Sequence, residues 1–231
     1  MVSLQREEPV AKRMLDLSLS SVGLLLLTPL MAVIAALVKL EDGGSAFYRA
    51  TRIGRAGRPF HMLKFRSMVT GADRIGGPIA ADNDPRVTRV GRVLRKWKLD
   101  ELPQLVNVLR GEMSLVGPRP EVSEYVALFT TEERAILEVC PGLTDWASLW
   151  ACRQGALLAE YGDANQAYLA LIRPTKLKLQ LLYISDGSFR TDCQILALTA
   201  LRLLGWRGLP ARVHALVEQA SASPHSPPGI S

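Results

Sequence analysis

Residues 17–38 read LSLSSVGLLLLTPLMAVIAALV, a run of 22 residues without a charged side chain between Asp16 and Lys39. As one straight helix this run would be roughly 33 Å long, about the thickness of the hydrocarbon core of a bilayer. A cleaved signal peptide is a weaker interpretation, because the run is long and has no clear small-residue cleavage site before a polar mature start. The run therefore predicts an N-terminal segment that associates with a membrane.

Two features of this segment argue against a simple membrane span. Thr28-Pro29 interrupts the run near its middle, and proline removes a backbone donor and clashes with the preceding turn, so a kink is expected there. Both flanks are basic, with Lys12 and Arg13 before the run and an acid-free, arginine-rich stretch over residues 43–72 after it. Positive charge tends to stay cytoplasmic, so we predict a re-entrant helix-break-helix that returns to the same face. A kinked full span and a buried soluble helix are the alternatives.

The composition fits one globular domain joined to this segment. The chain has 231 residues, a net charge of +6, 48% hydrophobic and 22% charged residues, and a mean hydropathy of +0.12. These values argue against a disordered chain and a multi-span transporter, and the basic balance suggests an anionic partner. The three cysteines form no CxxC pair and the three histidines do not cluster. Zinc ribbons and histidine-centred triads are therefore improbable, and carboxylates and cations must carry any catalysis.

The rest of the chain predicts an α+β fold that is mostly helical with a small β-hairpin. The hairpin strands are expected at residues 47–53 and 59–68, joined by a glycine-containing turn. A basic helix is expected at residues 86–97, and a second helix follows it, with Asp100 as N-cap and Gly111 as its stop. The predicted divisions are an N-terminal lead (1–11), the re-entrant helix-break-helix (12–40), a cytoplasmic catalytic domain with interfacial amphipathic helices (41–205) and a disordered tail (206–231).

Asp100-Glu101 is the strongest candidate for chemistry. Two adjacent carboxylates lie at the expected start of a helix, where the helix dipole favours their ionised form. An ionised aspartate can act as a covalent nucleophile, and its neighbour can hold Mg²⁺ through oxygen. The plain structural alternative is an N-cap followed by a first-turn acid.

Several cations lie where they could hold phosphate groups. Strand alternation predicts that Lys64 and Arg66 share one face, which would suit a diphosphate. Arg95 belongs to the basic helix that directly precedes Asp100, and Arg119 is fixed between two prolines in Gly117-Pro-Arg-Pro120. Each of these groups could also be an exposed polar face or an ordinary turn. No GxxxxGK[ST] or GxGxxG loop is present, so a nucleotide site of those kinds is unsupported.

The order of motifs resembles the bacterial sugar transferase family, the small monotopic phosphoglycosyl transferases, over about residues 10–205. The motifs that carry the resemblance are Lys12-Arg-Met-Leu-Asp16, the Thr28-Pro29 break, Arg52-Ile-Gly, Lys64-Phe-Arg-Ser-Met68, Asp84-Pro-Arg-Val-Thr-Arg-Val-Gly-Arg92, Leu99-Asp-Glu-Leu-Pro-Gln-Leu105, Asn107-Val, Gly111-Glu-Met-Ser-Leu-Val-Gly-Pro-Arg-Pro120 and Pro141-Gly-Leu-Thr144. The aspartate-containing and Pro-Arg-Pro blocks, in this order after a proline-broken apolar run, are highly specific.

The resemblance implies transfer of a sugar-1-phosphate from a UDP-sugar to undecaprenyl phosphate, with release of UMP, in the first membrane step of exopolysaccharide, capsule, O-antigen or glycoprotein glycan synthesis. It implies a covalent phosphosugar on Asp100, with Glu101 binding Mg²⁺ or assisting proton transfer. Lys64, Arg66, Arg95 and Arg119 would bind the substrate phosphates or their surroundings, and Thr28 and Pro29 would set the kink. The implied location is the cytoplasmic face of the bacterial inner membrane, with membrane lipids as partners and a homo-oligomer as one option.

One stretch departs from the usual family pattern. Many members read Gly-Ile-Thr-Gly-Trp-Ala-Gln-Val-Asn-Gly-Arg, whereas this chain reads Gly-Leu-Thr-Asp-Trp-Ala-Ser-Leu-Trp-Ala-Cys-Arg over residues 142–153. Arg153 is the candidate for the family arginine that contacts substrate. Two rival functions are a membrane-tethered nucleic-acid binder that uses the basic helix and a non-catalytic scaffold of a glycan pathway. Few aromatic residues accompany the basic stretches, which argues against nucleic acid as a partner, and both rivals predict indifference to loss of Asp100.

Overall fold

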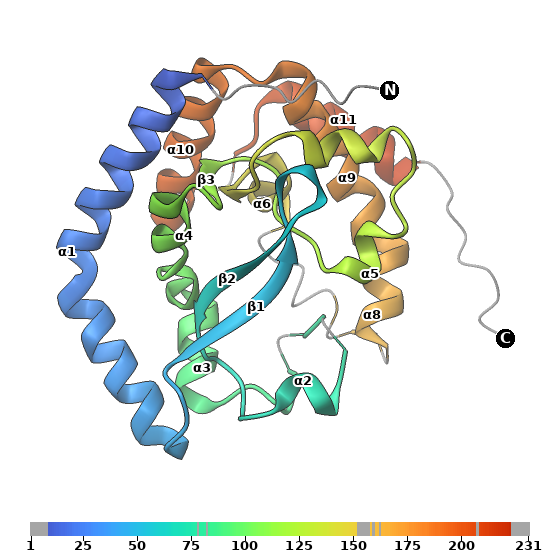
Figure 1. Ribbon diagram of the computed structural model, residues 1–231. Coiled ribbons are helices and arrows are strands. Elements are labelled where there is room, and N and C mark those ends of the chain that lie inside the picture. Colours follow the sequence, from blue (N-terminus) through green and yellow to red (C-terminus); the bar gives the residue numbers. More distant parts are fainter. Residues whose placement is uncertain are drawn as a thin grey trace, which may run out of the picture.

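The computed structural model describes residues 9–77, 79–81, 83–151, 158, 160, 161, 163–206 and 208–222. Most of these residues are helical, and two small sheets lie among the helices. A long N-terminal helix, α1 (Val10–Asp42), runs along one side of the molecule, and the β1–β2 hairpin crosses the centre (Figure 1). The described part of the chain contains one helix long and apolar enough to cross a membrane, α1, judged by length and composition. The predicted fold class, mostly helical with a hairpin and an apolar N-terminal helix, is confirmed at this level.

Helix α1 is continuous, which differs from the predicted helix-break-helix. It spans 33 residues with Pro29 inside it, and the Thr28 hydroxyl donates to the carbonyl of Leu24 at 2.6 Å. The helix therefore continues through Thr28 and Pro29 without interruption. Figure 1 shows it bowed around the rest of the molecule. Gly43 ends the helix in the left-handed conformation, with φ 74°, and its N–H returns to Lys39 O at 2.9 Å.

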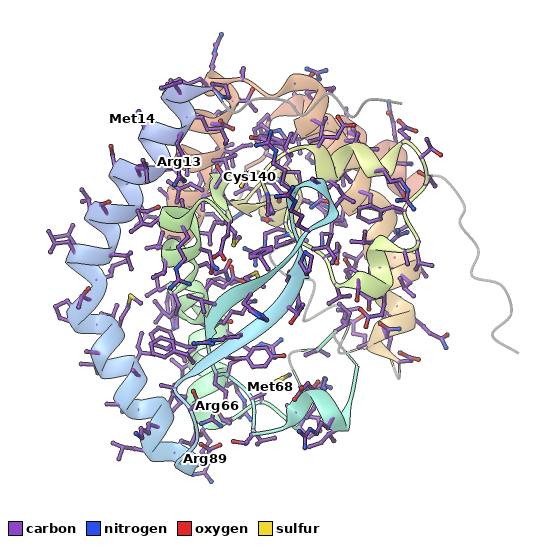
Figure 2. All side chains as sticks on the ribbon, in the orientation of Figure 1. Arg13, Met14, Arg66, Met68, Arg89 and Cys140 are labelled. Carbon is purple, nitrogen blue, oxygen red and sulfur yellow. The ribbon has the colours of Figure 1, made fainter. Side chains whose placement is uncertain are left out.

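The N-terminal part of α1 is bonded to the domain by side chains that the sequence analysis treated as flanking charges. Lys12 is buried and donates to Val116 O at 2.7 Å and to Asp192 at 3.0 Å. Asp16 is also buried and accepts from the N–H of Leu115 at 3.0 Å. Arg13 donates to two carbonyls at the end of α4 (Gln104–Arg110) (Figure 2). These bonds hold the start of α1 against the domain.

The C-terminal end of α1 is bonded to the same domain. Glu41 accepts from the first two N–H groups of α3 (Arg89–Lys96), one of them at 2.7 Å. Asp42 forms an ion pair with Arg66. Between these two anchored ends, large apolar side chains are exposed, including Leu25 at 77% and Leu26 at 71%. An apolar stripe of this size on a helix fixed at both ends is typical of a surface that contacts lipid or protein.

The hairpin has the predicted position and a shorter second strand. Strands β1 (Phe47–Ile53) and β2 (Pro59–Phe65) pair antiparallel, with Tyr48 opposite Lys64. Strand β2 was expected to reach Met68 but ends at Phe65, because the chain turns there to bring Arg66 onto α1. The tight connection, η1 (Arg55–Gly57), contains two residues with positive φ.

A second sheet, which the sequence analysis did not predict, brings two of the family motifs together. Strands β3 (Ser114–Val116) and β4 (Gly142–Thr144) pair in parallel. The backbones cross so closely that a Cβ on Gly142 would lie 2.1 Å from the nitrogen of Gly117. Only glycine fits at such a crossing, which explains why glycine follows Pro141 in one motif and precedes Pro118 in the other.

Helices fill the remaining described chain. They are α2 (Ala72–Ile75), α3, η2 (Leu99–Glu101), α4, α5 (Ser123–Val126), η3 (Glu133–Glu138), α6 (Trp146–Trp150), α8 (Ala164–Ala167), the π-helix η4 (Tyr168–Ile172), α9 (Arg173–Asp186), α10 (Phe189–Leu203) and α11 (Ala211–Ala222). Helix α3 begins three residues later than predicted, with Thr88 as its N-cap. Helix α11 corrects the prediction of a disordered tail over residues 206–231, because it lies within that range and buries Val213 in the core. Residues 223–231 lie outside the described chain.

The main core joins the sheets to the C-terminal helices. Its fully buried members include Val108, Met113, Leu179 and Ile195, contributed by α4, the segment before β3, α9 and α10. A smaller cluster joins Ile34 and Val38 of α1 to the residues around α3 and η2. The apolar N-terminal helix thus packs directly against the segment that carries Asp100 and Glu101.

Candidate active site

Asp100 and Glu101 lie in η2, the single 3₁₀ turn between α3 and α4. Lys98 precedes this turn in the left-handed conformation, with φ 57°, and redirects the chain after the basic helix. Asp100 was expected to cap the following helix, but α4 starts at Gln104 and Pro103 occupies its N-cap position. The helix dipole therefore does not explain the properties of Asp100, which depend on burial and on nearby cations.

The Asp100 side chain is a buried carboxyl without a hydrogen-bond partner on one oxygen. The residue is 7% exposed, and no described residue donates to its buried Oδ1. Burial raises the pKa of Asp100, although the positive charge of Lys64 opposes the shift. The sequence analysis expected an environment that favours the ionised form, and the structure shows the reverse. A buried polar atom without a partner is costly, so the arrangement suits a group that receives its partner with the ligand.

The environment of Glu101 favours its ionised form, in contrast to the environment of Asp100. Its Oε1 accepts from Arg119 at 2.9 Å and from Lys64 at 3.4 Å. Burial alone would raise the pKa of Glu101, but the charges of Arg119 and Lys64 outweigh it and hold the pKa at about 2. Adjacent carboxyls with opposite pKa shifts are typical of sites that divide roles between two acids. Glu101 stays ionised at neutral pH and fixes the two cations beside Asp100.

Lys64 reaches the site from β2 of the hairpin. Burial lowers the pKa of Lys64, and the negative charge of Glu101 limits this shift. The hairpin therefore delivers an ammonium group that bonds to Glu101 and interacts electrostatically with Asp100. Because burial removes most of the water around it, the charge of this ammonium acts strongly on an anion bound nearby.

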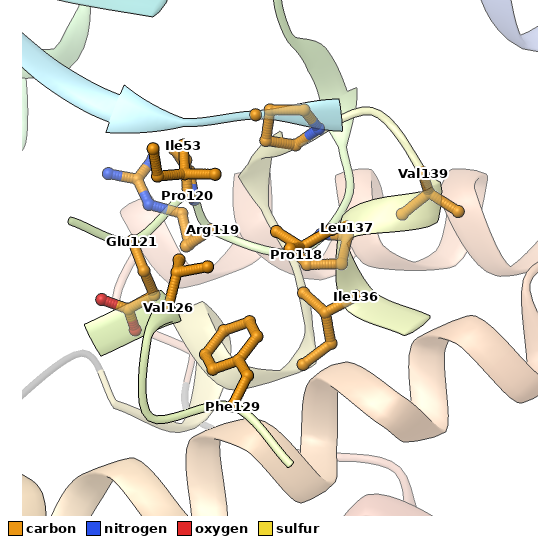
Figure 3. A pocket seen from close by; sticks show the side chains of 12 residues that line it. Ile53, Pro118, Arg119, Pro120, Glu121, Val126, Phe129, Ile136, Leu137 and Val139 are labelled. Atoms are coloured by element: carbon orange, nitrogen blue, oxygen red, sulfur yellow. The ribbon is translucent and has the colours of Figure 1, made fainter. Parts of the chain in front are cut away.

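Arg119 is held rigidly by three acceptors. Its guanidinium donates to Leu143 O at 2.7 Å and to Gln104 at 3.2 Å in addition to Glu101. Its own carbonyl accepts from Gln180 at 3.3 Å. The prolines on either side line a small apolar pocket, with Phe129 and Ile136 opposite them (Figure 3). The void in this pocket is about 10 Å³, room for one water molecule at most. The expectation that the prolines fix Arg119 therefore agrees with the packing.

These four side chains line one part of a large open cleft. The cleft has a volume of about 1220 Å³ and is bounded by the hairpin, η2, the Arg119 loop and parts of η4, α9 and α10. Asp100, Glu101, Lys64 and Arg119 all belong to its wall. A cleft of this size, with convergent charges and perturbed carboxyls, is the best-supported ligand site in the described chain.

The remaining predicted binding residues have different surroundings. The guanidinium of Arg66 is bonded to Asp42, to Ser45 O at 2.6 Å and to Thr70 (Figure 2). Arg66 thus borders the cleft but serves as an anchor for α1, and it does not share the site of Lys64. Arg95 lines the cleft and donates to Ala80 O at 3.3 Å. Arg153 lies outside the described residues.

The carboxylates fit a hard cation only in part. No cluster of three or more potential metal-ligating side chains occurs within the described ranges. The buried, unpartnered Oδ1 of Asp100 and the neighbouring carboxylate of Glu101 are nevertheless oxygen ligands of the kind that Mg²⁺ prefers. Mg²⁺ is commonly held by one or two carboxylates together with substrate phosphates and water. The donor set is therefore compatible with a cation that arrives with a phosphorylated substrate.

Comparison with known proteins decides the family. Residues 7–205 match the family model described as bacterial sugar transferase. The chain belongs to this family. A 47% identical match covers 61% of this sugar transferase and 68% of the exopolysaccharide production protein ExoY of Rhizobium meliloti (strain 1021). The resemblance inferred from the motifs is therefore confirmed.

Two further relatives have names that state a reaction. The UDP-glucose:undecaprenyl-phosphate glucose-1-phosphate transferase of Caulobacter vibrioides (strain ATCC 19089 / CIP 103742 / CB 15) is 39% identical over 84% of this sugar transferase and 69% of the relative. The enzyme of the same name from Escherichia coli (strain K12) is 37% identical over 83% of the chain, but only 39% of the relative is covered. Relatives of this sugar transferase thus include phosphosugar transferases that act on undecaprenyl phosphate.

The sequence analysis gave no binding role to four polar residues that lie on the cleft wall of this sugar transferase. They are Arg52, Glu121, Tyr168 and Lys176. Arg52 begins the recognised Arg52-Ile-Gly motif, and Glu121 follows Arg119 by two residues, which is a signal that could have marked it. Tyr168 and Lys176 belong to helical stretches without a recognisable motif, and only the fold brings them to the cleft.

Proposed function

We propose that this protein transfers a sugar-1-phosphate from a UDP-sugar to undecaprenyl phosphate and releases UMP. The observation that carries the proposal is the buried Asp100, beside the ion-paired Glu101, Lys64 and Arg119, on the wall of a large cleft. The names of the relatives support the substrate pair, and the basic balance of the chain suits two phosphorylated substrates.

Asp100 is the proposed nucleophile. Its carboxylate attacks the phosphorus that bears the sugar, a phosphorus–oxygen bond forms, and the bond to the oxygen shared with UMP breaks, so UMP leaves with that electron pair. A phosphate oxygen of undecaprenyl phosphate then attacks the same phosphorus and displaces Asp100, which regains its carboxylate. The two steps let one site serve a soluble donor and a lipid acceptor in turn.

The surrounding residues stabilise charge and orient the substrate. Arg119 and Lys64 lie close enough to Glu101 to neutralise it, and their remaining donors can contact the phosphate oxygens that gain charge in each step. Burial raises the pKa of Asp100, and the positive charge of Lys64 opposes this shift, so a nearby cation favours the ionised form that attacks. Asp100 and Glu101 would hold Mg²⁺, which when bound would lower the charge of the diphosphate and of the Asp100 carboxyl.

The α1 contacts support a monotopic arrangement on the cytoplasmic face of the bacterial inner membrane. Lys12 near the start of α1 and Asp42 at its end are both bonded to the same domain. A straight span would place these ends on opposite faces of a bilayer, about 30 Å of hydrocarbon apart. We therefore infer that α1 enters one leaflet with its exposed middle and that both ends stay on one side. Leu99 and Leu102, which flank the catalytic pair, pack against the C-terminal half of α1, so the site would lie at the membrane surface, within reach of lipid and cytosol.

The decisive experiment measures UMP formation. Full-length protein in detergent or nanodiscs is mixed with Mg²⁺, undecaprenyl phosphate and each of several UDP-sugars, and the Asp100→Asn variant is assayed in parallel. We expect wild-type protein to form UMP with at least one donor and the variant to be inactive. Intact-mass measurement without the acceptor should detect a phosphosugar adduct on wild type alone. Equal UMP formation by Asp100→Asn and wild type would show that Asp100 is not the nucleophile, whereas no UMP from wild type with any donor would favour the nucleic-acid or scaffold alternative.

A further inference from the structure

A second polar group lies on the cleft wall beside the catalytic residues and is not used by the proposed reaction. We name it the distal cluster, and it consists of Arg52, Glu121, Tyr168 and Lys176. Its members come from β1, the end of the Arg119 loop, the π-helix η4 and α9. A π-helix is rare and often marks a functional position, and here it begins at the tyrosine of this cluster.

The centre of the distal cluster is a buried ion pair held by a tyrosine. Lys176 donates to Glu121, and Tyr168 donates to the same Oε1 oxygen at 2.7 Å. Lys176 also donates to the Tyr168 hydroxyl at 3.1 Å. Burial alone would raise the pKa of Glu121, but Lys176, Tyr168 and Arg52 together outweigh burial and lower it. The pair is therefore ionised, internally neutral and fixed in position.

This pair presents both a hydrogen-bond donor and an acceptor toward the cleft. Lysine has three donors, and two of them are directed at Glu121 and Tyr168. Both partners of Glu121 bond to Oε1, and within the described chain no hydrogen bond reaches its Oε2. Such a pair matches a hydroxyl group, which donates and accepts. Its internal neutrality makes it less suited to another phosphate.

Arg52 is the member of the distal cluster that also interacts with a residue of the catalytic group. Burial lowers the pKa of Arg52, Glu121 opposes this shift, and the like charge of Arg119 adds to it. Arg52 is therefore close enough to Glu121 and Arg119 for their charges to shift its pKa. Arg119 and Glu121 are two residues apart on one loop, which places their backbones within about 7 Å. A ligand whose phosphate contacts Arg119 would bring its next chemical group to the distal cluster.

The two tyrosine rings beside the ion pair are not arranged to hold a nucleobase. Tyr125 and Tyr168 stack on each other, with ring centroids 5.3 Å apart, and both residues are buried. Their faces therefore contact protein. The hydrogen-bonding groups of the cluster that have no partner within the described chain fit the hydroxyl groups of a sugar ring.

We infer that the distal cluster binds the hydroxyl groups of the donor sugar and contributes to the choice of sugar. Lys176, Glu121 and Arg52 would contact the ring, and Tyr168 would position the ion pair. This inference rests on the proposed function, because it assumes that a sugar diphosphate occupies the cleft with its phosphates at Arg119.

The test uses two neighbouring tyrosines that differ in their bonds to the cluster. Tyr168→Phe removes the hydroxyl bonded to Glu121 and Lys176, whereas Tyr125→Phe removes a hydroxyl bonded to Asn165. Arg52→Gln is the second test variant, since it leaves the buried ion pair intact. For full-length protein we would measure the KM of the best UDP-sugar, kcat, the inhibition constant of UMP and the relative rates with UDP-glucose, UDP-galactose and UDP-N-acetylglucosamine.

We expect Tyr168→Phe and Arg52→Gln to raise the KM of the UDP-sugar about tenfold, as for the loss of a hydrogen bond to a charged group, and to change the order of preferred sugars. The inhibition constant of UMP should change less than twofold, and Tyr125→Phe should behave as wild type. A parallel rise in the UMP inhibition constant would overturn the inference and assign the cluster to the nucleotide. Unchanged KM values in both test variants would mean that the distal cluster has only a structural role, which would also overturn the inference. Failure of wild type with every donor would instead refute the proposed function.

Discussion

Arg119 Nη2 lies 2.9 Å from Oε1 of Glu101, so the cation of the Pro-Arg-Pro loop is bonded to the second carboxylate of the pair and not to the first. The consequence is a division between two adjacent acids. Glu101 is ionised and fully embedded in an ion-pair network, whereas Asp100 is buried with an unbonded oxygen. In the resting protein the ionised form of Asp100 is therefore disfavoured, whereas that of Glu101 is favoured. Substitutions of the two residues should therefore change the stability of the protein in opposite directions.

Replacing Asp100 with Asn should stabilise the protein at neutral pH while abolishing activity. The pKa of Asp100 is raised by burial, so the folded protein loses stability as the pH rises above the ordinary value of 3.8 and the carboxyl is forced to ionise. Asn keeps the shape and removes the charge. We expect a gain on the order of 1 kcal/mol, which corresponds to roughly 2–4 °C in melting temperature for a chain of this size.

Thermal unfolding measured from pH 4 to pH 8 checks this expectation. The difference between wild type and Asp100→Asn should shrink toward pH 4, because both side chains are then uncharged. A variant that melts below wild type at pH 7 would mean that Asp100 supports the fold, and the assignment of a strained catalytic carboxyl would be wrong.

Glu101→Gln should have the opposite effect on stability. It would leave Lys64 and Arg119 buried without a counter-charge, and breaking such a partly buried network is expected to cost about 3 kcal/mol. The pKa of Glu101 is lowered to about 2, so its contribution is fully present above the ordinary value of 4.5 and is lost as the pH falls toward 2. Chemical denaturation at pH 7 would measure the loss, with Glu112→Gln as a control whose carboxylate accepts from Asn107 away from the pair.

The sequence allowed the family, the hairpin and the apolar helix to be predicted, since each has a strong local signal. It did not predict that α1 would be continuous. Proline was expected to interrupt the helix. Instead the helix continues through Pro29, and the Thr28 hydroxyl donates a hydrogen bond to a carbonyl of the preceding turn. The parallel pairing of β3 and β4 was missed because strands of three residues have no periodic pattern.

Four of the motif residues proposed for the site, Asp100, Glu101, Lys64 and Arg119, lie together on the cleft wall. Their roles stay predictions, and the more distant residues of the wall were given no role from the sequence. Arg66 shares strand alternation with Lys64, yet the strand ends at Phe65 and the partner of Arg66 is Asp42 of α1. Alternation predicts a shared face only while the strand continues, and tertiary contacts decide the orientation beyond its end.

The contacts of both ends of α1 predict that the two ends are accessible from the same side of the membrane. In a cysteine-free background, single cysteines at Val10, which is 79% exposed, and at the exposed Ser45, just beyond the end of the helix, should both react with an impermeant maleimide in inside-out vesicles. Neither should react in intact spheroplasts. A cysteine at Leu26 should be protected in both preparations. Labelling of the two ends from opposite sides would establish a full span.

Gly142→Ala should disrupt the site without touching a charged residue. The added methyl group would lie 2.1 Å from the nitrogen of Gly117 and 2.3 Å from its oxygen, so the two backbones must separate. Crowding of this kind costs about 1–3 kcal/mol or more, and the displaced backbone directly precedes Pro118 and Arg119. We therefore expect a lower melting temperature together with a kcat for UMP release reduced at least tenfold.

Gly77→Ala is the matched control, because a methyl group there meets no atom within 4 Å, and it should leave both quantities near wild type. If Gly142→Ala unfolds earlier but retains full kcat at low temperature, the crossing supports stability alone and the position of Arg119 does not depend on it.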